Sequence, residues 1–287
     1  MSSLKVSVVI PTLGEITLKD TLEHLNNGTI IPDEILICIP KGYQLKFDYS
    51  KFHNIEVVFT EKAGQVNQRI EGFKLAKNKY VLQIDSDLFL EKYCLENLMK
   101  TIQNNHKSCV GPKLYDLKSN KYFSTCIPKN EKKLSLYERF FFKNINGNEG
   151  FKPGIISKSG EPMGVLENGE FKHLDWLPGA CILHFKENLI LENYYPFPGK
   201  AYAEDIYHSL ELKKEGINLI RDKNAICHVD FSSSQAKNIF LYFRIIYSSL
   251  NARKLYRKKT SSSNLRFYIF MFLSFLGSLR KFIKNNG

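Results

Sequence analysis

Two aspartates one residue apart, Asp85 and Asp87, give the sharpest chemical signal in this chain of 287 residues. They stand in the run IDSD, directly after the apolar residues 80–84. Two carboxylates at the end of a buried strand can bind one hard divalent cation together with the ribose or phosphate beside it. The same tripeptide also occurs as a turn with two solvated aspartates. Its position after a hydrophobic strand favours the functional interpretation.

A second acidic pair, Glu204 and Asp205, stands at the start of a predicted helix over residues 205–214. An aspartate there can cap the helix and interact with its dipole. It can also act as a general base that takes a proton from an acceptor hydroxyl. The residues alone leave both interpretations open for Asp205.

Two further side chains have a chemical and a structural interpretation. His228 ends the short apolar run AICHV, and its imidazole could complete a divalent-metal site with Asp87 or could be structural. Trp176 is the only tryptophan and precedes LPGA. Its ring could belong to the core, or a sugar could stack on it while Gly179 permits a close approach.

Short apolar segments alternate with amphipathic ones and would position these groups. Strands are predicted over residues 6–10, 34–39, 55–59 and 80–84, and helices are predicted around residues 18–25 and 66–73. This alternation predicts a parallel, three-layer α/β sheet. Ligands bind such sheets beyond the carboxyl ends of the strands, where residues 11–12, 61–69 and 85–87 fall. The pattern breaks down over residues 128–172, which we interpret as a flexible acceptor-side insertion or a plain surface insertion.

Five motifs follow one another along the chain: VSVVIPTLGE, the helix entry with Arg69, IDSD, PGA and AED. In this order, over residues 4–230, they resemble the motifs of family 2 glycosyltransferases of the GT-A fold. The resemblance implies an α/β, Rossmann-like, three-layer domain and an inverting transferase that uses a nucleoside-diphosphate sugar, with a UDP-sugar as the leading candidate, and Mn²⁺ or Mg²⁺. It implies Asp205 as the general base, with Glu204 contacting the acceptor, and Asp87 and His228 as metal ligands. The implied donor-binding residues are Pro11, Thr12, Leu13, Glu15, Gly64, Arg69, Asp85 and Ser86.

Positive charge is concentrated at the end of the chain. No Asp or Glu follows Asp230, whereas eleven of the 41 Lys and Arg residues do, so the body is nearly neutral. Residues 267–279 are uncharged but too few to span a bilayer, which takes about 20 residues. We therefore predict a transferase domain over residues 1–232 and a basic, amphipathic helical tail over residues 233–287 that lies in an anionic membrane interface. Packing on the body or on a second subunit, a true span and a nucleic-acid arm are the alternatives.

The six dispersed cysteines and the absence of a signal-peptide pattern at the N-terminus predict a cytoplasmic protein, peripheral on the inner face of the membrane. The near-neutral body argues against a nucleic-acid partner. We expect sugar transfer to a glycan or lipid-linked glycan in surface polysaccharide synthesis, such as capsule or O-antigen. A membrane-tethered nucleotide-sugar or glycan-binding protein without turnover, and a sugar nucleotidyltransferase, are the competing interpretations.

Overall fold

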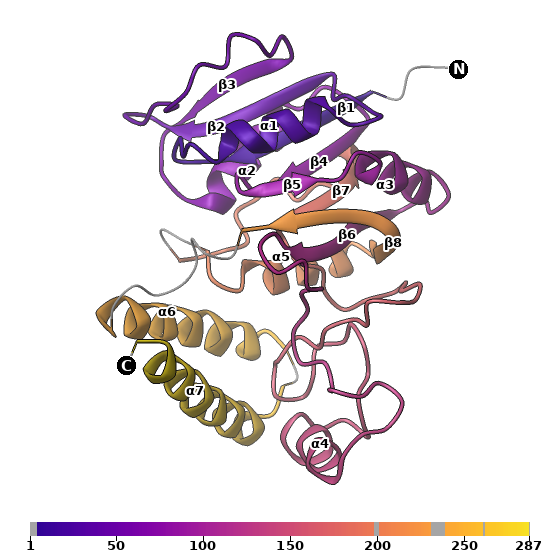
Figure 1. The fold of residues 1–287 in the computed structure, drawn as a ribbon, viewed down its shortest axis with the longest axis vertical. Helices are drawn as coiled ribbons and strands as arrows, with labels where there is room; N and C mark the ends of the chain where they lie inside the picture. Colours follow the sequence, from indigo (N-terminus) through magenta and orange to yellow (C-terminus); the bar gives the residue numbers. More distant parts are fainter. Residues whose placement is uncertain (1–4, 198–200, 231–238, 261, 287) are drawn as a thin grey trace. The chain divides into compact units, whose positions relative to one another are not determined.

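The computed structural model describes residues 5–197, 201–230, 239–260 and 262–286 (Figure 1). The chain divides into two compact units, one formed by Met1–Phe123 with Glu167–Ser234 and the other by Ser124–Leu166 with Gln235–Gly287. The predicted boundary between residues 232 and 233 lies outside the described residues.

The first unit is built on one sheet of eight strands in the order β3-β2-β1-β4-β7-β6-β8-β5. Four of its strands match the segments predicted from apolar runs, and their bounds are β1 Val6–Pro11, β2 Glu34–Pro40, β3 Ile55–Thr60 and β4 Tyr80–Ile84. The other four are β5 Leu88–Leu90, β6 Ser108–Asp116, β7 Cys181–Phe185 and β8 Asn218–Val229.

The prediction of a parallel sheet is right for one half of the sheet and wrong for the other. Strands β1, β2, β3 and β4 pair in parallel, as β6 and β8 do. Strand β7 runs antiparallel to both β4 and β6, and β5 runs antiparallel to β8. The sheet is therefore mixed. The chain enters β7 after a long excursion and not through a helical crossover, so nothing in the local pattern specifies its direction.

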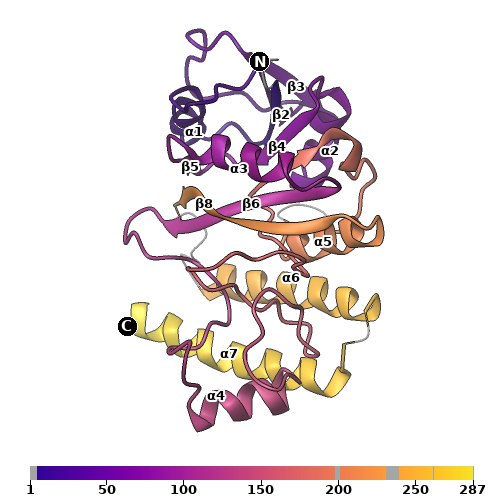
Figure 2. The same ribbon diagram turned by 90° about the vertical axis from the view of Figure 1, so that its right-hand side faces the viewer.

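Helices cover both faces of the sheet and give three layers (Figure 2). On one face, α1 (Leu18–Asn26) and α3 (Cys94–Gln103) pack on the apolar side chains of β1, β4 and β7. On the other face lie α2 (Gln65–Leu75) and α5 (Glu204–Lys214), where Phe73 of α2 and His208 of α5 both contact the ring of His184. Gly72 lets α2 approach the sheet, because a Cβ there would lie 2.4 Å from a methyl carbon of Val9.

The second unit combines the mid-chain insertion with the C-terminal helices α6 (Ile239–Lys258) and α7 (Asn264–Asn286). The insertion contains α4 (Leu136–Phe140), which begins with a capping box between Ser135 and Glu138, and a π-helical segment at Phe141–Ile145. The ring centroids of Phe141 and Phe270 of α7 lie 6.0 Å apart. No helix within the described ranges has the length and apolar character that a membrane crossing requires.

Candidate active site

A cavity of about 710 Å³ lies at the carboxyl ends of β1, β4 and β8, within the first unit. Residues that follow these three strands line it together with the first turns of α2 and α5 and the segment before β7. This is the position at which open α/β sheets bind ligands. Eleven of the residues predicted from the sequence line it, namely Pro11, Thr12, Leu13, Glu15, Gly64, Asp85, Ser86, Asp87, Gly179, Glu204 and Asp205.

Three predicted residues, Arg69, Trp176 and His228, are not among those that line the cavity. Trp176 is 8% exposed and belongs to the buried hydrophobic residues of the first unit. His228 lies on β8 with its Nε2 atom 3.0 Å from Oε1 of Glu91 and its ring centroid 5.9 Å from that of Tyr115. Because side chains alternate along a strand, His228 points away from the side occupied by its buried neighbours Cys227 and Val229.

Arg69 lies beneath the cavity and connects its two acidic groups. Its side chain is 0% exposed, and its two terminal nitrogens donate to Glu204 at 2.9 Å and to Asp85 at 3.0 Å. Glu204 and Arg69 are 135 positions apart in the sequence. The guanidinium fork therefore fixes the start of α5 relative to the end of β4, which sets the distance between the two acidic motifs.

Other polar side chains complete this network. The hydroxyl of Tyr194 donates to the second oxygen of Glu204 at 3.0 Å, and Nε2 of Gln65 donates to Asp85 at 2.9 Å. Burial and the Glu204 carboxylate raise the pKa of the Tyr194 hydroxyl well above its ordinary value, so this group is a neutral donor. Each carboxylate next to Arg69 thus has a second hydrogen-bond donor.

The environments of Asp85 and Asp205 raise the pKa values of both side chains. Burial raises the pKa of Asp85 to about 6, against the opposing charge of Arg69 and with a contribution from the carboxylates of Glu204 and Asp87. Burial, and next the charge of Glu204, raise the pKa of Asp205 to about 7. A carboxylate with a pKa near neutrality is suited to accept a proton in general-base catalysis.

Close backbone approaches shape the cavity at the start of α5. A Cβ at Gly179 would lie 2.3 Å from Oε1 of Glu204, so this position excludes every larger residue unless the carboxylate moves. Ala203, which precedes α5, has a φ of 59° in the left-handed region that non-glycine residues rarely adopt. The turn that presents Glu204 and Asp205 is therefore a strained one, of the kind that is found at functional sites.

The end of β1 is ordered by its own hydrogen bonds. The hydroxyl of Thr12 donates to Glu15 at 2.6 Å, and the same carboxylate accepts from the backbone nitrogen of Leu13 at 3.1 Å. Nε2 of Gln68 donates to the carbonyl oxygens of Thr12 and Cys38, each at 2.7 Å. These contacts fix the loop after β1 against α2.

Sequence reasoning missed four polar residues of the cavity: Thr17, Gln65, Gln68 and Asp230. The two glutamines share one side of the first turn of α2, three positions apart, where a helix facing a sheet usually carries apolar residues. Asp230 directly follows β8, in the same relation to its strand that Asp85 has to β4. Both signals were present in the sequence.

The cavity fits a divalent cation. Six acidic residues line it, and none of the described lining residues is a Lys or an Arg. The diphosphate expected from the sequence would need a positive charge at this acidic surface, and the carboxylates of Asp85 and Asp87 offer the hard oxygen ligands that Mg²⁺ and Mn²⁺ take. No group of three His, Cys, Asp or Glu side chains in the part of the chain that the structure describes is arranged to hold a metal alone. Protein sites for Mg²⁺ commonly use one or two carboxylates and complete the shell with substrate phosphates and water.

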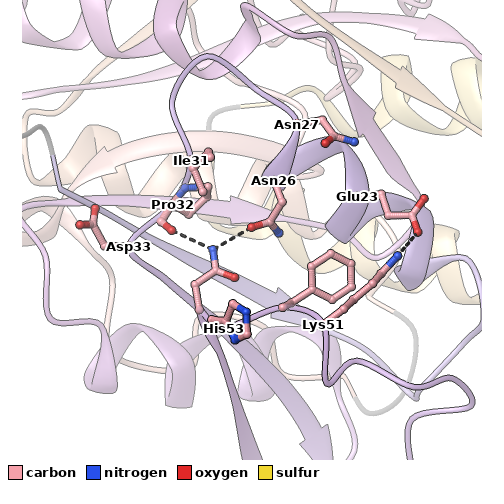
Figure 3. A pocket seen from close by; sticks show the side chains of 10 residues that line it. Glu23, Asn26, Asn27, Ile31, Pro32, Asp33, Lys51 and His53 are labelled. Carbon is pink, nitrogen blue, oxygen red and sulfur yellow. Dashed lines mark hydrogen bonds and ion pairs between the residues drawn. The ribbon is translucent and has the colours of Figure 1, made fainter.

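A second cavity, of about 550 Å³, lies at the amino ends of β2 and β3 (Figure 3). Lys51 and Glu23 form an ion pair at 2.6 Å across it. Nδ2 of Asn54 donates to Asn26 at 3.1 Å and to the carbonyl oxygen of Pro32 at 2.8 Å. These polar groups bind one another at the sheet edge away from the acidic motifs, so we place the chemistry in the first cavity.

Comparison with known families identifies the chain. A sequence profile described as Glycosyl transferase family 2 matches residues 7–157, which is more than half of the protein. The chain belongs to glycosyl transferase family 2. The resemblance expected from the motifs is thus confirmed, and sugar transfer is the activity of this family.

Solved structures show where the fold recurs. The crystal structure of GalNAc-T7 with UDP, GalNAc and Mn²⁺ has a TM-score of 0.57 and 15% identity over 87% of this family 2 chain and 50% of its own. S. aureus TarS has a TM-score of 0.47 and 15% identity over 86% of this chain and 39% of its own. The chain thus spans half the length of GalNAc-T7, and at this identity that likeness supports a shared GT-A-like fold alone. No curated protein sequence gives a significant match.

Proposed function

We propose that this family 2 glycosyltransferase moves a sugar, with inversion, from a nucleoside-diphosphate sugar to a hydroxyl of a glycan or lipid-linked glycan. One observation carries the proposal. Asp85 and Asp87 after β4, and Asp205 at the start of α5, line the same cavity at the carboxyl ends of the strands. An inverting transfer needs a binding site for the leaving diphosphate and a base for the attacking hydroxyl, and this cavity offers a group for each.

The donor end of the cavity is formed by the loop after β1 and by the end of β4. We assign Pro11, Thr12, Leu13, Glu15 and Gly64 to the nucleoside, with a UDP-sugar as the leading donor, and Asp85 and Ser86 to the ribose. Mn²⁺ or Mg²⁺ held by Asp87 would neutralise the charge that develops on the leaving diphosphate. Arg69 positions Asp85 from below, through the 3.0 Å ion pair.

Asp205 takes the proton of the acceptor hydroxyl as that hydroxyl attacks the sugar. Its pKa of about 7 allows it to be ionised before the reaction and to accept the proton readily in the transition state. Glu204 contacts the acceptor, and Gly179, which has no side chain, leaves room for the acceptor. The Glu204 side chain is held by Arg69 and Tyr194, so the turn that bears the base is fixed before the acceptor arrives.

We place the reaction in the synthesis of a surface polysaccharide, such as capsule or O-antigen, on the cytoplasmic face of the cell membrane. The support for this setting is the distribution of charge and apolar residues along the chain. The last 57 residues after Asp230 contain no acidic residue and are rich in aromatic ones. Such a segment suits a membrane that carries a lipid-linked acceptor.

Calorimetry of the nucleoside diphosphate, with and without a chelator, tests the donor site. Binding should require Mn²⁺ or Mg²⁺, and Asp87→Ala should weaken it. Asp205→Asn should leave this affinity within a few-fold and lower transfer about 10²- to 10⁴-fold, because the base acts on the acceptor. Metal-independent binding would overturn the role of Asp87, and near-normal turnover of the Asn variant would reduce Asp205 to a residue of the helix start.

A further inference from the structure

Among its described side chains, helix α7 carries one packed apolar face and one exposed apolar face. Phe267 and Phe270 are 1% and 7% exposed and contact Arg257 of α6 and Phe141 of the insertion. On the opposite side, large apolar side chains recur at spacings of three, four and seven and are between 37% and 71% exposed: Leu265, Ile269, Phe272, Leu276 and Ile283. A row of exposed apolar side chains along several turns of one helix indicates a binding surface.

Exposed apolar side chains also occur on the neighbouring helices of the same unit. Phe243 of α6 is 47% exposed, and its ring centroid lies 6.4 Å from that of Phe275 in α7. About three turns after Phe243, the exposed side of α6 carries the lysines Lys254 and Lys258 in place of aromatic residues. In α4, Leu136 is 87% exposed. We call the exposed apolar residues of α4, α6 and α7 the apolar surface of the second unit.

The charge of the second unit favours one class of partner. Ser124–Leu166 and Gln235–Gly287 together contain 18 Lys and Arg against 4 Asp and Glu, whereas the rest of the chain contains 23 against 25. The second unit therefore bears all of the excess positive charge. A second copy of the same unit would be repelled by this charge, and a nucleic acid would leave the apolar side chains in water. An anionic lipid surface satisfies both the charge and the apolar face.

We propose that the mid-chain insertion and the two C-terminal helices form one peripheral membrane-binding unit, with the exposed face of α7 in the headgroup region of an anionic bilayer. The insertion is part of this unit and is not only an acceptor-side loop. Apolar side chains of α7 enter the interface, and lysines such as Lys254 and Lys258 bind lipid phosphates. The inference deepens the proposed function, since it names the surface that would bring the transferase to a lipid-linked acceptor.

Co-sedimentation of the full-length protein with vesicles tests this surface. Binding is expected to vesicles of phosphatidylcholine with phosphatidylglycerol, to weaken as salt is raised, and to be much weaker to phosphatidylcholine alone. Phe272→Ser should lower the affinity on the order of tenfold. The matched control is Phe59→Ser, because both phenylalanines are 60% exposed and Phe59 belongs to the first unit. The control should bind as the wild type does.

A pair of charge variants isolates the electrostatic part. Lys254→Gln with Lys258→Gln should weaken anionic-vesicle binding about fivefold for each lysine removed. Lys46→Gln with Lys186→Gln, two exposed lysines of the first unit, should have no such effect. If Phe272→Ser does not fold, Leu276→Ser gives the same test on the next turn of α7.

The proposal would be overturned by equal binding to neutral and anionic vesicles, by equal losses in the variants of both units, or by a chain that dimerises through α7 and does not bind vesicles. Tight binding of an oligonucleotide that displaces vesicles would also overturn it. Nucleoside-diphosphate affinity, measured in the same variants, separates this proposal from the proposed transfer reaction. Vesicle binding without nucleotide binding would support the membrane surface and contradict the reaction.

Discussion

Replacing Arg69 by Met removes a buried positive charge and keeps most of the volume of the side chain. In the wild type this guanidinium is 0% exposed and pairs with Glu204, which is 7% exposed, and with Asp85, which is 25% exposed. The variant leaves two carboxylates facing an apolar thioether. Tyr194 and Gln65 still donate to them, but no positive charge remains in the pair.

The expected loss follows from this geometry. Removing one partner of a buried ion pair costs about 3–5 kcal/mol, because the remaining charge is buried without compensation. Asp85 keeps some contact with water, so we expect about 3 kcal/mol at pH 7. Folded domains are stable by only about 5–15 kcal/mol, so the variant should fold but unfold at clearly lower denaturant concentration.

Urea unfolding followed by tryptophan fluorescence measures this loss in the correct unit, since Trp176 is the only tryptophan and lies in the first unit. Lys74→Met on the same helix is the matched control. Its ion pair with Glu71 is about half exposed on both sides, so the control should change the free energy of unfolding by less than about 0.5 kcal/mol.

The pH dependence of the Arg69→Met loss provides a second check. The charge of Arg69 opposes the rise in the pKa of Asp85, so its removal raises that pKa further. Protonation then neutralises the uncompensated carboxylate at a higher pH than in the wild type, so the deficit of the variant should shrink as the pH falls toward about 6. A loss below about 1 kcal/mol at pH 7, or a deficit that grows toward acid, would refute the buried-bridge role.

The remaining predictions concern the carboxylates and Gly179. The pKa of Asp205, about 7, predicts that kcat/KM rises with pH through neutrality as the base loses its proton, and a pH–rate limb near 4 would contradict this. The pKa values of Asp85 and Asp205 in the folded protein, about 6 and about 7, exceed the ordinary value of 3.8, so the folded state binds more protons than the unfolded state. The free energy of unfolding should therefore fall from pH 4 to pH 7. Thermal melts across this range measure the change, and a rise in stability would contradict it. Gly179→Ala should displace Glu204 and lower the free energy of unfolding by about 1–3 kcal/mol. The control is Gly277→Ala, where an added Cβ meets nothing within 4 Å, and it should not destabilise the protein. Equal melting temperatures for the two alanine variants would count against the close approach at Gly179.

Local pattern accounts for much of the first unit. Continuous apolar runs mark β1, β2 and β4, because a strand covered on both faces needs apolar residues at every position. Strand β3, at the edge of the sheet, was also predicted from its apolar run but is only partly buried. Helical spacing of Leu18, Leu22 and Leu25 marks α1. The functional side chains then follow from a simple rule, since polar residues directly after parallel strands gather at one edge of the sheet. The family motifs in this order were sufficient to predict membership of glycosyl transferase family 2.

Other features depend on pairings that are distant in the sequence. The antiparallel direction of β7 leaves no trace in its composition, because a buried strand is equally apolar in either direction. From the sequence, Arg69 was predicted to contact the sugar donor. Its partner Glu204 lies 135 positions away, and only the packing of the two elements makes the arginine a buried bridge.

The union of the insertion with the C-terminal helices is also a product of tertiary structure. The sequence by itself determined the elements, the acidic motifs at their ends and the concentration of positive charge after Asp230. The tertiary structure decided that His228 faces Glu91 while Asp230 lines the cavity, and that α7 packs on the insertion. The physical reason is that burial and periodicity are local properties of a chain, whereas the choice of partner for each face is fixed by the packing of all elements together.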